Sequence, residues 1–203
     1  PYTVNIESSS TIYANANADY LFALIGYGDK CKDSQVIENI ENLDVSNSTS
    51  MLRMFFNTGV NSMTSLKLGD KFDTSNVTSM ASMFSGTGKR NMTSLEFGKK
   101  FNTSKVTDMK YMFHDCGYDK MTSLNLENFN TSNVKYMQYM FLGCGYTSMT
   151  DLKLGSNFNT SKVIKMNYMF KNCGYTAMTS LNLGDKFDTS NVTDMSNMFN
   201  GTG

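Results

Sequence analysis

Hydrophobic and polar positions recur along this chain with a period of 28–29 residues. In residues 63–68, Leu66 and Leu68 alternate with the polar Lys67, which predicts a short strand with one apolar face. A Phe-x-Thr-Ser block follows and returns with its threonine at positions 74, 103, 131, 160 and 189, at spacings of 29, 28, 29 and 29 residues. A degenerate sixth copy starts near Asp44. A fixed period of this length indicates a solenoid.

The second half of each unit has a different spacing. Phe72 is followed by Val77, Met80, Met83 and Phe84, and the last four lie at offsets 0, 3, 6 and 7. That spacing predicts a two-turn helix, capped by the Thr-Ser pair and ended by glycine. The pattern therefore predicts an α/β leucine-rich-repeat solenoid of about six repeats, with stacked parallel strands on one face and short helices on the opposite face.

The first 44 residues do not follow the period. We expect residues 1–44 to form an N-terminal cap, because an open solenoid end exposes apolar side chains, and residues 45–203 to form the repeat solenoid. The last copy is followed by no comparable cover. We therefore expect the chain to be a piece of a longer protein with an uncapped C-terminal end.

Composition narrows the possible partners. The chain has 18 basic and 18 acidic residues and no net charge, so neither nucleic acid nor an acidic membrane surface would attract it. No apolar run is long enough for a membrane helix, so we expect no membrane insertion in this segment. We expect no enzyme, because no nucleophile motif or phosphate-binding loop occurs.

The cysteines are the first candidates for special chemistry. Cys116, Cys144 and Cys173 occupy one repeat position, where other copies have threonine. Adjacent coils would lie about 4.8 Å apart, within disulfide reach, but parallel side chains in one column rarely attain the required dihedral. We expect buried free thiols, with a disulfide as the open alternative. With His114 as the single histidine and no zinc spacing, we expect no metal and no cofactor.

The repeat block itself resembles a known family. The sequence Phe-Asp-Thr-Ser-Asn-Val-Thr-x-Met-x-x-Met-Phe, with Leu-x-Leu before it and Phe-x-x-Cys-Gly after it, is similar to the BspA-like leucine-rich-repeat surface proteins over residues 44–203. The resemblance implies an extracellular or cell-surface solenoid involved in adhesion or host-protein binding. The repeats here are longer than the mid-twenties usual in that family, and we recognise no secretion signal or wall anchor in the sequence.

These observations leave several function hypotheses. The first is a non-enzymatic surface adhesion module that recognises a host or neighbouring-cell protein or glycan through its repeat face. The alternative is a structural surface protein that assembles end to end or side by side into a coat or filament. Ice binding is weaker, because the copies read Thr-Ser-x-Val-Thr and form no flat Thr-x-Thr strand.

Two groups of residues are candidates for ligand binding. Outward strand positions differ between copies and have no packing role; they suit a protein or an extended polymer. Loop tyrosines offer rigid rings that suit a glycan. The strand positions are Lys67, Glu96, Asn125, Lys153 and Asn182, and the loop tyrosines are Tyr118, Tyr146 and Tyr175.

Overall fold

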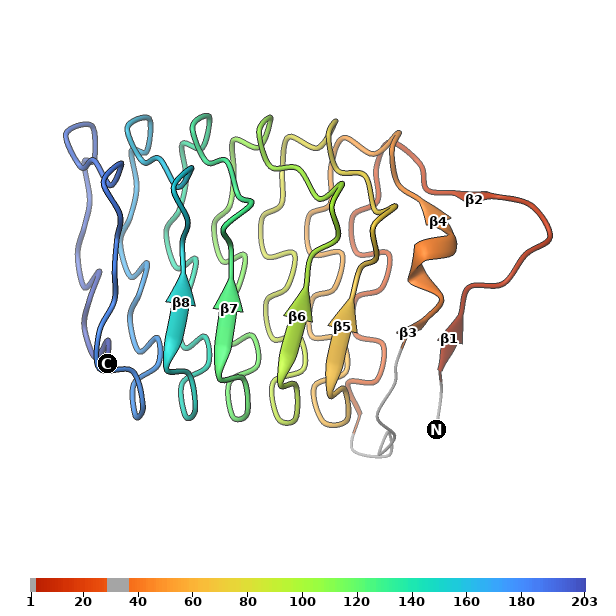
Figure 1. The fold of residues 1–203 in the computed structure, drawn as a ribbon, viewed down its shortest axis with the longest axis horizontal. Coiled ribbons are helices and arrows are strands. Elements are labelled where there is room, and N and C mark those ends of the chain that lie inside the picture. Colours follow the sequence, from red (N-terminus) through yellow and green to blue (C-terminus); the bar gives the residue numbers. More distant parts are fainter. Residues whose placement is uncertain (1–2, 29–36) are drawn as a thin grey trace.

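The computed structural model describes residues 3–28 and 37–203 as one stack of coils that runs from the N-terminal to the C-terminal end (Figure 1). Short strands at matching positions pair in parallel between neighbouring coils. The pairs are β1 (Val4–Asn5) with β3 (Ile37–Glu38), β2 (Ile12–Tyr13) with β4 (Leu43–Asp44), β5 (Ser65–Lys67) with β6 (Ser94–Glu96), and β7 (Ser123–Asn125) with β8 (Asp151–Lys153). The predicted solenoid of stacked parallel strands is confirmed.

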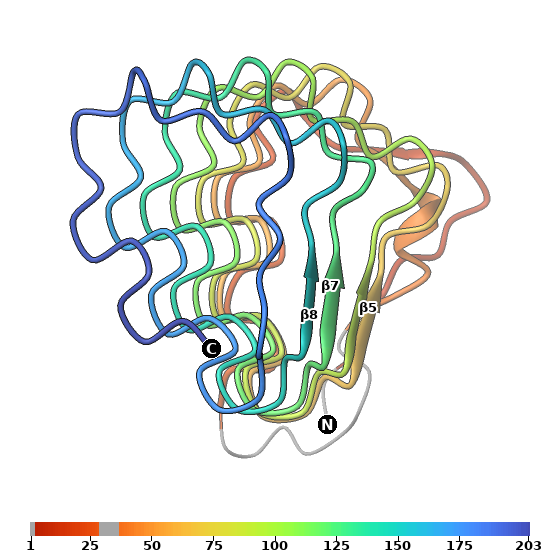
Figure 2. The same cartoon turned by 60° about the vertical axis from the view of Figure 1, so that its left-hand side comes forward.

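Strands β5 to β8 form one wall of the stack (Figure 2). The central leucine of each is buried, and the third residue is exposed. The leucines stack in register, Leu66 against Leu95 and Leu124 against Leu152. The period-2 pattern therefore predicted correctly which side of the strands faces the core.

The predicted helices are wrong. Residues 80–87 form consecutive turns, in which Met83 N–H donates to Met80 O and the same i to i+3 bond recurs two residues later, from Ser85 to Ser82. Every second N–H instead donates a hydrogen bond to a carbonyl of the next coil. The donors are Met80, Ser82, Phe84 and Gly86, at 2.7–3.0 Å. An α-helix needs these N–H groups for its own i–4 bonds. Among the described residues the one helical element is the 3₁₀ turn η1 (Ile40–Asn42).

These turns require left-handed backbone at unusual residues. Tyr111, Tyr139 and Tyr168, at the same position in three coils, have φ of 58°, 60° and 60°. A positive φ at the third residue is what type II turns require. The conformation costs a bulky residue about 1–2 kcal/mol, and the inter-coil hydrogen bonds formed by the same turn offset that cost.

The core is a column of stacked rings. Neighbouring phenylalanines along it have centroids 5.3–5.6 Å apart and planes within 14° of parallel. Sixteen of the 17 methionines are buried around it, and only Met195 is exposed. The column consists of Phe22, Phe55, Phe84, Phe113, Phe141, Phe170 and Phe199.

Buried threonines also join the coils. The Thr131 hydroxyl donates to Asn159 O at 2.8 Å and accepts Asn159 N–H at 2.7 Å. Thr74, Thr103 and Thr160 form the same reciprocal pair with the coil that follows each of them. Beside them, Asn159 Oδ1 accepts the N–H of Ser161, an Asx turn that recurs throughout this column. This column therefore has a structural, hydrogen-bonding role.

Candidate binding surfaces

The strand wall brings the predicted strand positions together. Lys67, Glu96, Asn125 and Lys153 are the exposed third residues of β5 to β8, and Lys67–Glu96 and Asn125–Lys153 are register partners. Lys67 Nζ lies 3.1 Å from Glu96 Oε1, with 65% and 53% of the two side chains exposed. An ion pair this exposed contributes about 1 kcal/mol or less, so both groups remain available to a ligand.

Asn182 extends this surface beyond β8. It lies in a segment without assigned strand pairing, yet it is exposed and borders a polar groove of about 460 Å³ that Lys153 also lines. Asp151 lies on the same groove, 3.7 Å from Lys153 Nζ. All five predicted strand positions therefore belong to one polar surface, which we call the strand face.

The loop tyrosines form a separate stack. The rings of Tyr118 and Tyr146 are 4.7 Å apart and those of Tyr146 and Tyr175 are 4.9 Å apart, with planes within 17° of parallel. Lys89 Nζ lies 5.0 Å from the Tyr118 ring centre. Because the rings cover each other's faces, this tyrosine row presents mainly edges and hydroxyls. The middle ring, Tyr146, has no free face on which a sugar could stack, whereas Tyr175 at the end of the row is 48% exposed.

The cysteine column is buried and unbridged, as predicted. Cys116, Cys144 and Cys173 are fully buried free thiols. Burial raises the pKa of Cys173 to about 12 and raises the pKa of Cys116 and Cys144 well above that of an ordinary thiol. A thiol that stays protonated is a poor nucleophile and metal ligand. The fourth cysteine, Cys31, lies outside the described residues.

The single histidine lies in a small polar cluster. His114 Nδ1 is 3.2 Å from Ser85 Oγ, and its Nε2 is 3.8 Å from a carboxylate oxygen of Asp115. Burial lowers the pKa of His114, and the neighbouring Lys89 lowers it further, against the opposing charge of Asp115. Ser85 is itself buried, and Asp115 is paired with Lys89 at 2.8 Å. The cluster therefore joins neighbouring coils and leaves no exposed hydroxyl.

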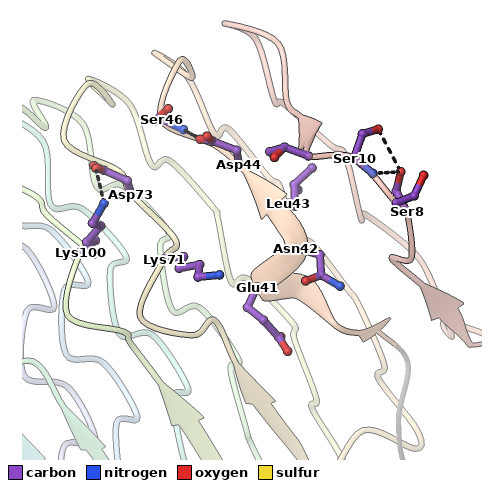
Figure 3. Close-up of a pocket in the computed structure, with 12 residues that line it drawn as sticks. Ser8, Ser10, Glu41, Asn42, Leu43, Asp44, Ser46, Lys71, Asp73 and Lys100 are labelled. Carbon is purple, nitrogen blue, oxygen red and sulfur yellow. Dashed lines mark hydrogen bonds and ion pairs between the residues drawn. The ribbon is translucent and has the colours of Figure 1, made fainter.

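Sequence reasoning missed a polar pocket of about 700 Å³ near the N-terminal end (Figure 3). Its walls are the loop Ser8–Thr11 on one side and Lys71, Asp73 and Lys100 on the other, with η1 and Asp44 between them. Lys100 Nζ lies 3.8 Å from Asp73 Oδ2. Three consecutive serines where the period breaks were the available signal. Hydroxyls, carboxylates and ammonium groups together suit a polar ligand.

Hydrogen bonds fix the charge of two carboxylates in this pocket. The hydroxyl and N–H of Ser46 lower the pKa of Asp44, despite partial burial. Burial raises the pKa of Asp73, but the hydrogen bonds from Ser75 and the charge of Lys100 outweigh it and lower the pKa overall. Both groups are therefore anionic at neutral pH.

The described residues contain no cluster of histidine, cysteine and acidic side chains that could hold a metal ion. Over the same part of the chain, no helix has the length and apolar character needed to cross a membrane.

Stacked parallel strands, a ring-filled core and repeating exposed columns define a repeat solenoid protein. The profile of a family described as "Mycoplasma protein of unknown function, DUF285" matches residues 29–147, 60–182 and 119–203. These overlapping matches cover all the repeats, and the chain belongs to this family. None of the curated proteins and none of the solved structures compared with the chain matches it.

Proposed function

We propose that this protein is a non-enzymatic adhesion module of an extracellular cell surface, of the BspA-like leucine-rich-repeat kind. Its ligand would be a host or neighbouring-cell protein or glycan. The observation that carries the proposal is the contrast within each strand: the inward residue is always leucine, whereas the outward residue is Lys67, Glu96, Asn125 or Lys153. Packing restricts the inward position, so variation outside is free to serve recognition.

The arrangement of the strand face supports an extended ligand. Its exposed groups follow one another along the stack, at about 4.8 Å per coil within the paired strands β5–β6 and β7–β8. Individual contacts would be polar and weak, since each group is also hydrated. Affinity would then grow with the number of coils engaged, through avidity. The tyrosine row offers a second, more aromatic surface beside it.

Binding can be tested directly with the purified chain. A panel of immobilised host matrix proteins and a glycan array should include at least one surface that retains the chain, while an unrelated solenoid of equal charge is not retained. Uniform lack of retention over the panel and the array, at concentrations up to the millimolar range, would contradict the proposal.

A second candidate function, assembly of copies end to end, is supported by the two terminal coils. Most of the exposed large apolar side chains lie there: Tyr13, Tyr20, Leu21, Leu24 and Tyr27 in the first coils, and Met195 and Phe199 in the last. In the stack, N–H groups such as that of Phe170 donate to the next coil. In the described part of the chain, the corresponding N–H of Phe199 has no acceptor.

The two ends are complementary. The last coil offers the N–H groups of Met195, Asn197, Phe199 and Gly201. The first coil offers the carbonyls at the matching positions, those of Asn17, Asp19, Leu21 and Ala23, and none of these eight groups is bonded within the described residues. Repetition of such a head-to-tail contact would extend a filament, provided that its rotation does not close a ring. The apparent molar mass measured by static light scattering should then rise with concentration, and Phe199→Lys should abolish this rise. Monomeric behaviour of the parent at all concentrations would exclude this second function.

A further inference from the structure

One corner of the solenoid is irregular. Between the strand leucine and the following phenylalanine, most coils have three residues, as between Leu68 and Phe72, but only two separate Leu126 from Phe129. The strand ladder is interrupted at the same place: β5 pairs with β6 and β7 with β8, while no ladder joins β6 to β7. A cavity of about 280 Å³ lies at this break, and we call it the notch.

The apolar lining of the notch is mainly aromatic, with Leu95 beside three phenylalanines. Phe97 replaces the leucine found at this position in the other copies, such as Leu68 and Leu126. Its ring centroid lies 4.8 Å from that of Phe101 and 5.0 Å from that of Phe129. Those two rings are buried, whereas Phe97 is only partly buried. The notch therefore has a partly exposed aromatic ring at a position where the other copies have leucine, and the inner side of this ring packs edge-on against Phe84 and Phe113.

The polar lining is dominated by acceptors. Glu96, Asn125, Glu127 and Asn128 border the notch, and no basic side chain lines it. The Asn125 amide is already used, because its Nδ2 donates to Glu127 Oε2 at 3.0 Å and its Oδ1 accepts the N–H of Glu127 at 2.9 Å. What remains for a ligand is chiefly the carboxylate oxygens of Glu96 and Glu127, and these require a donor.

We propose that the notch binds an arginine side chain of a protein partner. A guanidinium presents planar donors to carboxylates and can stack on an aromatic face, and the notch offers both surfaces. A lysine ammonium can also lie over a ring, as Lys89 does over Tyr118, but it has no planar group that stacks on the ring while its donors pair with two carboxylates. The inference rests on the proposed function, since it gives the partner chemistry of one part of the strand face. The Lys67–Glu96 pair is exposed, so a ligand displaces it at little cost.

The test uses the 203-residue chain and a defined probe. The peptide acetyl-Gly-Arg-Gly is displayed in four copies on streptavidin, beside versions with lysine and with citrulline, the neutral analogue of arginine. Binding is measured at two salt concentrations by biolayer interferometry. We expect arginine to bind at least fivefold more tightly than lysine, and citrulline to show no binding. Equal retention of arginine and citrulline, or of arginine and lysine, would overturn the proposal.

Variants separate the notch from general electrostatics. Glu96→Gln with Glu127→Gln should weaken arginine binding about tenfold, and Phe97→Leu, which restores the leucine of the other coils, should remove the preference over lysine. The matched control, Asp151→Asn with Asp185→Asn, removes two exposed carboxylates outside the notch and should bind like the parent. Equal weakening in both double variants would show charge attraction alone and refute the site.

The experiments distinguish failure of the notch proposal from failure of the proposed adhesion function. Arginine binding lost in the notch variants, with no retention on the matrix panel, would support the notch and contradict adhesion. Retention on the panel, with no arginine preference, would do the reverse. Circular dichroism of each variant, compared with the parent, verifies that the fold is intact.

Discussion

The carboxamide of Asn57 fills the space beside Gly86 in the next coil, so that a Cβ on Gly86 would collide with Asn57 Oδ1. The same arrangement recurs two coils later, where Asp115 covers Gly143, and again between Asn172 and Gly201. On another face, Lys105 and Lys162 each donate to an asparagine of the preceding coil. The structural repeat is therefore two coils of 57–58 residues, built from two unlike halves.

This pairing predicts a coupled effect of two substitutions. Gly86 has φ of 69°, so Gly86→Ala adds backbone strain to the collision and should lower the free energy of unfolding by roughly 2–4 kcal/mol. In an Asn57→Gly background the collision is gone, and the loss should fall to about 1 kcal/mol. Urea unfolding of the four proteins measures the coupling. Additive effects would contradict the two-coil unit.

The buried threonines should matter more than the exposed ones. Thr131→Val keeps the shape but leaves the N–H and carbonyl of Asn159 without a partner, which should cost roughly 2–4 kcal/mol. Thr78 is exposed and its hydroxyl bonds Thr49 O at 3.1 Å, so Thr78→Val is the matched control and should change stability by about 0.5 kcal/mol or less. If the two valine variants unfold at the same urea concentration, the buried threonines have no special role.

The sequence allowed the strand side of the fold to be predicted, but not the turn side. Leu66 and Lys67 showed which side of the strand faces the core, because successive side chains of a strand point to opposite sides. The spacing of Val77, Met80, Met83 and Phe84 fits a helix and a series of turns equally well, because both structures bury these residues. The choice depends on Gly86 N–H donating to His114 O in another coil, a long-range bond that no local pattern reveals.

Of the candidate surfaces, the strand positions were predictable from their variation between copies. The tyrosine row was predictable as a column, but the loss of free ring faces depends on the 4.7–4.9 Å stacking of Tyr118, Tyr146 and Tyr175. The pocket beside η1 arises where the non-repeating residues 8–11 and η1 meet the first repeats, so Ser8 and Lys71 could not be connected in advance.

Replacing a member of the cysteine column by threonine, the residue at the same position in other coils, should increase stability. Thr87 donates its hydroxyl to Phe55 O at 2.6 Å, and Thr58 and Thr202 make the equivalent bond. Cys144→Thr should form this bond to the preceding coil and raise the free energy of unfolding by about 0.5–1.5 kcal/mol. Cys144→Ala, which lacks the hydroxyl, should lower it. A less stable threonine variant would show that the column needs sulfur.

The same thiols predict a pH dependence. In the unfolded chain they ionise near pH 8.5, whereas burial raises the folded-state pKa of Cys173 to about 12 and raises those of Cys116 and Cys144 as well. The folded state then holds more protons, so stability is unaffected below about pH 8 and falls above it, by about 1.4 kcal/mol per pH unit for each thiol. Substituting all three by threonine should remove this fall in urea titrations between pH 7 and 10. Parallel curves for the two proteins would mean that the thiols are accessible.

The central claim is that the strand face recognises a partner. The most direct measurement presents the matrix-protein panel and the glycan array to three proteins: the parent, a variant with Lys67, Glu96 and Lys153 all changed to alanine, and a variant with Tyr118, Tyr146 and Tyr175 all changed to leucine. Circular dichroism and urea unfolding confirm that each is folded. We predict that the strand-face variant binds each immobilised protein that retains the parent at least tenfold more weakly than the parent does. The tyrosine variant should bind these proteins as tightly as the parent. Unchanged binding by the folded strand-face variant would contradict the account.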